Sequence, residues 1–110
     1  MNLLKAYVQH EGDPEVSELG YVDLEGAREL VEKLPLSSPL EEIPELVGFE
    51  RGEGFIEFTR LSADAYLVRM EDRGKEKHLI GELDSKKALE CLEDFFMGEE
   101  LRWEGEMESY

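Results

Sequence analysis

Two similar segments occur in the sequence, and this internal repeat limits the folds that the chain can adopt. Residues 22–34 align without gaps on residues 83–95. Each segment begins with an apolar residue and Asp, followed by residues of apolar character at helical spacing. The identical pairs are Asp23/Asp84, Ala27/Ala88, Glu29/Glu90 and Glu32/Glu93, and the matched apolar pairs are Leu30/Cys91, Val31/Leu92 and Leu34/Phe95.

The repeat extends upstream of each helix into a predicted pair of strands. The stretch from Ala6 to Asp23 has 18 residues and the stretch from Ala65 to Asp84 has 20, a difference that a turn can absorb. A hairpin with one helix has an apolar face that it cannot cover alone, so two such ββα units would bury these faces together. Convergence on a common order of strand, cap and helix is the alternative to duplication.

The predicted helices run from about residue 24 to 34 and from about 85 to 97. Asp23 and Asp84 precede them, and a carboxylate at this position accepts hydrogen bonds from free N–H groups of the first turn. Pro35 is expected to end the first helix, and Gly98 to end the second.

Alternation of apolar and polar residues predicts strands over 2–10 and 16–22, and hairpins that pair 46–50 with 55–61 and 65–71 with 75–83. The connector 35–44 contains Pro35, Pro39 and Pro44. Alternation over 101–107 indicates either an edge strand held by Trp103 or a loose tail. We therefore expect one α+β domain over residues 1–110, with a mainly antiparallel sheet from two ββα units and a central hairpin, two amphipathic helices on one face, and an acidic C-terminal strand or tail over 99–110.

Composition excludes several classes of protein. The formal charge of −16 disfavours nucleic acid and anionic membranes as partners, because phosphates are bound by clustered Lys and Arg. Leu, Ile, Val and Phe make up over a quarter of the chain, which favours a folded domain over an acidic disordered tail. A single cysteine and the lack of a signal-like start predict a cytoplasmic protein, and many Glu with one Asn and one Gln are typical of thermophiles.

No residue pattern predicts a catalytic, cofactor-binding or metal site. His10 and His78 lack the spacing of metal ligands, and both are expected at partly exposed strand positions. Cys91 occupies a core position of the second helix, where a thiol behaves as a small hydrophobic group. The basic residues Arg69, Arg73, Lys75 and Lys77 are interleaved with acidic ones, which predicts cross-strand charge pairs, with a small anion-binding patch as the alternative.

The C-terminal stretch is the most suggestive candidate for a binding site. Acidic groups around an aromatic side chain suit a basic partner with a groove. The candidate partner-binding residues are Glu99, Glu100, Trp103, Glu104, Glu106 and Glu108. Packing of Trp103 against the core is the alternative explanation of this pattern.

These observations favour a non-enzymatic interaction domain that binds a protein partner of basic character, with a homo-oligomer as an open alternative. A narrower version is an inhibitor that mimics the charge of nucleic acid, or an immunity protein for a basic nuclease, which predicts acidic groups concentrated on one face. The alternative from another class is a small-ligand-binding domain or enzyme, with a pocket between the two ββα units or at a dimer interface.

Overall fold

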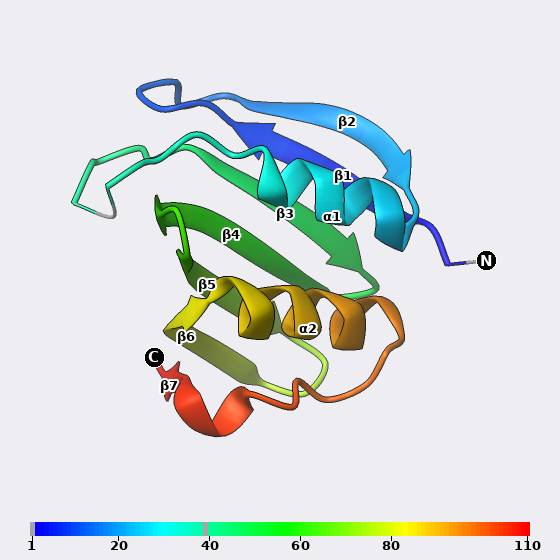
Figure 1. The fold of residues 1–110 in the computed structure, drawn as a ribbon. Helices are drawn as coiled ribbons and strands as arrows, with labels where there is room; N and C mark the ends of the chain where they lie inside the picture. Colours follow the sequence, from blue (N-terminus) through cyan, green and yellow to red (C-terminus); the bar gives the residue numbers. More distant parts are fainter. Residues whose placement is uncertain (1, 39) are drawn as a thin grey trace.

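A single antiparallel sheet of seven strands runs through the whole molecule, as the computed structural model of residues 2–38 and 40–110 shows (Figure 1). The strand order is β2-β1-β3-β4-β5-β6-β7. The strands are β1 (Leu4–Gln9), β2 (Val16–Val22), β3 (Leu46–Arg51), β4 (Gly54–Ser62), β5 (Ala65–Asp72), β6 (Lys77–Asp84) and β7 (Glu108–Ser109).

The helices α1 (Leu24–Glu32) and α2 (Ser85–Phe96) lie side by side on one side of this sheet and run in opposite directions (Figure 1). Both begin at the predicted caps. The carboxylate of Asp23 accepts a hydrogen bond from the backbone N–H of Gly26 at 2.8 Å, and that of Asp84 accepts one from Lys87, also at 2.8 Å. Gly98 follows α2 with a φ of 73°, a left-handed conformation in which glycine is favoured.

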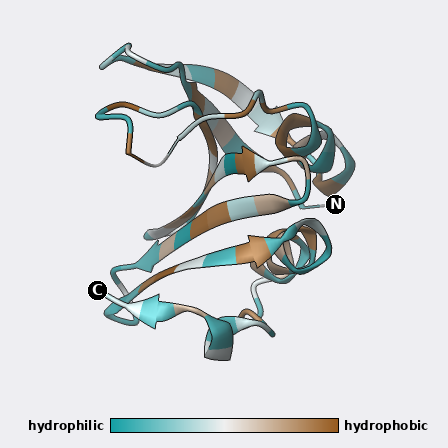
Figure 2. Ribbon diagram, turned by 60° about the vertical axis from the view of Figure 1, so that its left-hand side comes forward, coloured by the Kyte–Doolittle hydropathy of each residue, from teal (hydrophilic) through white to brown (hydrophobic). Residues whose placement is uncertain are grey.

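The core lies between the helices and the sheet. Side chains from both helices and from β1, β3, β4, β5 and β6 form one buried cluster, which includes Val31, Phe49, Phe58, Leu92 and Phe96. Figure 2 shows hydrophobic residues alternating with hydrophilic ones along the strands, which is the pattern of a sheet with one buried face.

Most of the predicted elements are present, and the α+β class with a mainly antiparallel sheet is confirmed. The predicted connector 35–44 contains Pro39, which lies outside the described residues. No helix among the described residues is long and apolar enough to cross a membrane.

The C-terminal segment differs from the predicted strand over 101–107. Glu104–Glu106 form a short 3₁₀ helix, η1, and the edge strand comes later, as β7. The alternation that predicted a strand arises because Leu101 and Met107 are both buried, on either side of the 3₁₀ turn. The segment is therefore packed against the body of the domain.

Candidate binding surface on the uncovered face of the sheet

Both helices lie on the same side of the sheet, which leaves its other face without a covering helix in the described part of the chain (Figure 1). We call this side the uncovered face. Cross-strand pairing places two adjacent rows of residues on it. One row contains Tyr7, Gly48, Glu57, Arg69 and Ile80, and the other contains Lys5, Glu50, Phe55, Glu71 and His78.

A hydrogen-bonded chain occupies the middle of the uncovered face. The Tyr7 hydroxyl donates to Glu57 Oε2 at 2.6 Å, and the Arg69 guanidinium donates to Glu57 Oε1 through Nη2 at 2.6 Å and Nε at 3.0 Å. A Cβ atom at Gly48 would overlap the ring of Tyr7, so the missing side chain is what allows the ring to lie across β3 toward Glu57. The guanidinium of Arg69 also lies 5.2 Å from the centre of the Phe55 ring.

The chain of contacts continues to the C-terminus. Glu71 accepts a hydrogen bond from the Tyr110 hydroxyl at 2.7 Å, and its other oxygen lies 3.2 Å from His78 Nδ1. The hydrogen bond from Tyr110 lowers the pKa of Glu71. Burial and the same hydrogen bond raise the pKa of Tyr110 to about 12, and burial with the Glu57 contact raises the pKa of Tyr7. At pH 7 both phenols are therefore protonated donors, and Glu71, which accepts the hydrogen bond from Tyr110, is ionised.

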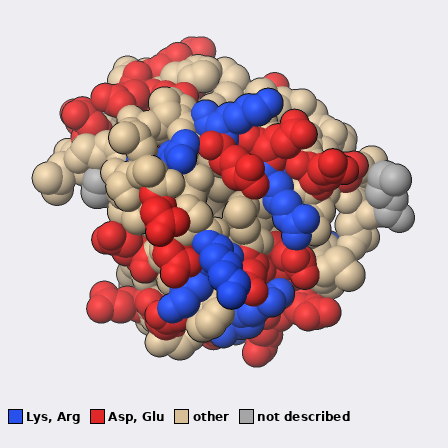
Figure 3. All heavy atoms as spheres, viewed as in Figure 1, with Lys and Arg blue, Asp and Glu red and all other residues tan. Residues whose placement is uncertain are grey.

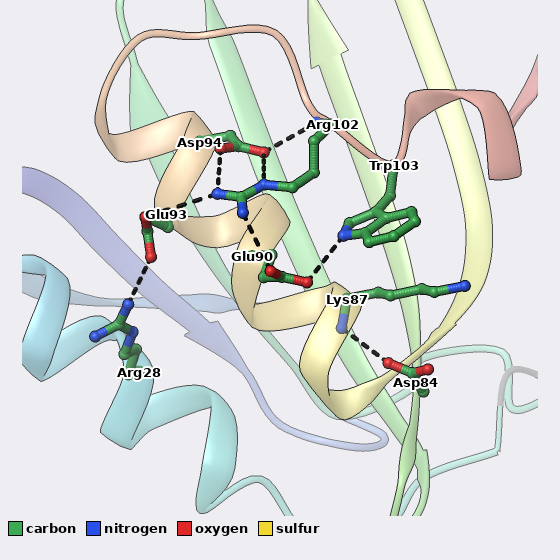
Figure 4. A network of polar contacts seen from close by, with 8 residues as sticks. All are labelled: Arg28, Asp84, Lys87, Glu90, Glu93, Asp94, Arg102 and Trp103. Atoms are coloured by element: carbon green, nitrogen blue, oxygen red, sulfur yellow. Dashed lines mark hydrogen bonds and ion pairs between the residues drawn. The ribbon is translucent and has the colours of Figure 1, made fainter.

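The C-terminal segment, which the sequence predicts as a binding site, is attached to α2 through Arg102 and Trp103 (Figure 4). Arg102 Nη2 lies 2.8 Å from Asp94 Oδ1, and Arg102 Nε and backbone N–H both donate to Asp94 Oδ2. Burial alone would raise the pKa of Asp94, but the hydrogen bonds from Arg102 outweigh it and hold this pKa below its ordinary value. Trp103 Nε1 donates to Glu90 at 3.1 Å, and Lys87 Nζ lies 4.6 Å from the centre of the Trp103 ring.

Three of the predicted acidic residues face lysines of the same chain. Lys77 Nζ lies 3.0 Å from Glu104 and 3.7 Å from Glu100, and Lys87 Nζ lies 2.8 Å from Glu106. Glu99 and Glu108 are exposed. The structure thus brings Trp103 close to part of the predicted acidic set, and the role of this set in partner binding stays a prediction.

Charges of both signs are mixed on the helix side of the molecule. Figure 3 shows Lys and Arg interleaved with Asp and Glu over the helices and the C-terminal segment. Arg28 of α1, for example, donates to Glu93 of α2 at 2.8 Å. A face of one charge sign, as a nucleic-acid mimic would need, is not what this side presents.

A hollow of about 400 Å³ lies at the end of the sheet, where the β3–β4 and β5–β6 turns meet the segment after α2. Its lining includes the buried side chains Met70, Phe95 and Leu101, with Arg51 and Lys75 among its charged residues. A second hollow, of about 230 Å³, lies where the start of α1 meets the end of α2, which is between the two predicted ββα units.

The remaining candidate residues, His10 and Cys91, contact other residues of the same chain. His10 Nδ1 lies 2.8 Å from Glu45 Oε2 at the end of β1. Cys91 is buried in the core, as predicted, and burial raises the pKa of its thiol to about 12. The described residues contain no group of three or more His, Cys, Asp or Glu side chains arranged to hold a metal ion.

Comparisons with known proteins leave the site to be interpreted from its own geometry. The chain matches no family model, and neither the curated proteins nor the solved structures contain a significant match to it.

Proposed function

We propose that the protein is a non-enzymatic interaction domain that binds a basic protein partner through the uncovered face of its sheet. The observation that carries the proposal is the hydrogen-bonded row of Tyr7, Glu57 and Arg69 in the middle of that face. Tyr and Arg are enriched among the residues that dominate binding energy at protein interfaces. Side chains that are already fixed lose little conformational entropy when a partner binds.

The charge of the molecule favours a partner of basic character. Twenty-eight acidic residues stand against 12 basic ones, and Glu50 and Glu82 are exposed on the uncovered face. Complementary charge accelerates association and disfavours acidic competitors, with an effect that weakens as salt is added.

The protonation states of Tyr7, Tyr110 and Glu71 suit these three groups to binding rather than to acid–base chemistry. General acid–base catalysis near neutral pH needs a group that gains or loses a proton there. The pKa values of Tyr7 and Tyr110 are raised and that of Glu71 is lowered, so each is shifted away from neutral pH. Donors and acceptors of fixed protonation state suit recognition of a partner's polar groups.

The hollow at the end of the sheet supports the alternative, a small-ligand site, because apolar side chains line it together with charged ones. Two results together would favour this alternative. The first is that no partner is captured. The second is that a ligand raises the melting temperature, and that this rise is lost when Arg51 or Lys75 is changed.

Duplication of a ββα unit also remains a proposal. Strand order supports it: β2-β1-β3 on one side corresponds to β6-β5-β4 on the other. Because each neighbouring pair is antiparallel, a two-fold axis between β3 and β4 would exchange β1 with β5 and β2 with β6 in their correct directions. The opposite directions of α1 and α2 agree with the same axis (Figure 1).

The test of the proposed function is affinity capture from native lysate at low salt, with elution in a salt gradient and measurement of Kd for the purified partner. The double variant Glu50→Lys/Glu82→Lys changes the uncovered face, and Glu25→Lys/Glu29→Lys makes the same charge change on exposed positions of α1. We expect the first to raise Kd at least about tenfold, a loss of about 1.4 kcal/mol, and the second to have a much smaller effect.

Two results would decide against this surface. Equal Kd values for the two double variants would show that only net charge matters. A loss of binding confined to Glu99→Lys/Glu100→Lys, at two exposed positions after α2, would place the partner on the C-terminal segment, the surface predicted from the sequence. Light scattering on the purified protein tests the homo-oligomer.

A further inference from the structure

The two edges of the sheet differ in whether the C-terminal segment pairs with them. At the β6 edge, Leu79 pairs with Ser109 and Ile80 with Glu108, and the backbone N–H of Tyr110 donates to the carbonyl of His78. At the other edge, β2 pairs with β1 alone, and no strand of the described residues lies beyond it. An edge strand offers unpaired N–H and C=O groups to any extended chain that approaches.

The side chains of β2 are unusually apolar for an exposed edge. Val16, Leu19 and Tyr21 are 52%, 43% and 71% exposed. The charged residue within the strand, Glu18, is directed to Lys5, with 2.9 Å between its Oε1 and the lysine Nζ. Edge strands that avoid pairing usually carry charged side chains, proline or bulges. Of these, β2 has one charged residue, which is ion-paired with Lys5, and one bulge.

A bulge interrupts β2. Ala6 pairs with Gly20 and Tyr7 with Glu18, so Leu19 is an extra residue, and Gly20 has a φ of 84°. The bulge divides the edge into two short straight stretches on either side of Leu19. A second copy of the chain would bring a second bulge to the seam, whereas an unrelated strand need not carry one.

The charge of the residues around β2 also favours a basic segment over a second copy of the chain as the partner of this edge. Residues 11–22, which form β2 and the turn before it, contain four acidic residues and no Lys or Arg. A second copy would double this negative charge at the seam, whereas an extended segment rich in Lys or Arg would neutralise it.

We propose that β2 is a strand-addition site, and that an extended basic segment of the partner pairs with it as an eighth strand. The inference rests on the proposed function for the basic character of the partner, and it adds the mode of binding. Main-chain hydrogen bonds to β2 supply affinity in such sites, and flanking side chains supply selectivity. Glu15, which is exposed and directly precedes β2, supplies selectivity for positive charge.

The test uses two eight-residue peptides with blocked ends, one of alternating Arg and Val and one with four Arg and four Pro in which the prolines occupy both odd and even positions. The two carry equal charge, but only alternate residues of a strand donate to a given neighbour, so the second peptide lacks a needed N–H in either register. We expect the Arg/Val peptide to slow amide exchange within residues 16–22 by about tenfold or more at saturation, and the Arg/Pro peptide to leave it unchanged.

A pair of charge variants provides the matched control. Glu15→Lys is expected to raise the Kd of the Arg/Val peptide about five- to tenfold, and Glu53→Lys, an equal charge change in the exposed β3–β4 turn, to leave it nearly unchanged.

Three outcomes would overturn strand addition. Protection by both peptides alike would show that charge alone drives binding. Peptide contacts confined to the uncovered face, blocked by Glu50→Lys/Glu82→Lys, would leave the proposed function standing without the edge site. Protection of residues 16–22 that rises with protein concentration in the absence of peptide would assign the edge to a second copy. A different result would show that the proposed function itself is wrong, namely that no basic protein is captured at low salt.

Discussion

The contact between Gly48 and Tyr7 makes the uncovered face sensitive to a substitution at position 48. A methyl group at position 48 overlaps the Tyr7 ring, so Gly48→Ala must displace the ring and break its hydrogen bond to Glu57. We expect a loss of about 1–3 kcal/mol in the free energy of unfolding, measured by urea titration. At Gly105, a Cβ atom would meet nothing within 4 Å, so Gly105→Ala is the matched control. Equal effects of the two substitutions would contradict the described ring position.

Asp94 links the C-terminal segment to α2, and its carboxylate predicts a pH dependence. Its pKa in the folded state is below the ordinary value of 3.8, so its contribution to stability is complete above that pH and is lost as the pH falls through the folded-state pKa. We expect Asp94→Asn to cost about 1.5–3 kcal/mol at pH 7, because the buried carboxylate accepts hydrogen bonds from a charged guanidinium.

The difference between the wild type and Asp94→Asn should shrink as the pH is lowered below about 4. Urea titrations at a series of pH values measure this difference. Glu99→Gln, at an exposed position, controls for removal of a carboxylate. A difference that stays constant down to pH 2 would show that the ionised carboxylate is not the stabilising species.

At the scale of elements, the apolar stripe of α2 carries the packing of the helix on the sheet. Leu92 is fully buried, so Leu92→Ala should cost about 2–5 kcal/mol. Leu30 of α1 is only partly buried at the edge of the same core, and its change to Ala should cost less. Thermal or urea unfolding measures both. A cost below about 1 kcal/mol for Leu92→Ala would contradict the assigned core.

Local signals were sufficient to predict the helices and most strands. The caps Asp23 and Asp84, and Gly98 at the end of α2, act within one turn of the chain, so their effects can be recognised in the sequence. For the C-terminal segment, the expected alternatives of an edge strand over 101–107 and a loose tail did not include the packed 3₁₀ turn. The contact of Arg102 with Asp94 is tertiary, and alternation alone cannot distinguish a strand from a packed turn with two buried residues.

The polar row of the uncovered face could not be predicted in the same way. Tyr7 and Glu57 are 50 positions apart and meet only because β1 lies next to β3, and β3 next to β4. Strand order is not encoded in any local pattern. Cross-strand charge pairing on the β5–β6 hairpin was predicted for Arg69, yet its shortest ion pair is with Glu57 of β4. A polar aromatic residue facing a strand glycine, as in Tyr7 and Gly48, was the one available signal.

For the whole molecule, the excess of carboxylates predicts a response to salt. With a formal charge of −16, repulsion between acidic groups outweighs the attraction of the ion pairs, and salt screens both. We expect the free energy of unfolding to rise by about 1 kcal/mol between low and moderate NaCl, which corresponds to about 4 °C in Tm. Calorimetry at several NaCl concentrations measures this rise. A fall in Tm would show that the ion pairs of Arg102 and Lys77 dominate.

Carboxylate footprinting of the complex tests whether a basic partner binds on the uncovered face. Carbodiimide labelling with and without the captured partner, read by mass spectrometry, compares Glu50 and Glu82 on that face with Glu25 and Glu29 on α1, all four of them exposed. We expect the partner to protect Glu50 and Glu82 and to leave Glu25 and Glu29 fully labelled. Protection of the α1 carboxylates, with Glu50 and Glu82 still labelled, would contradict it.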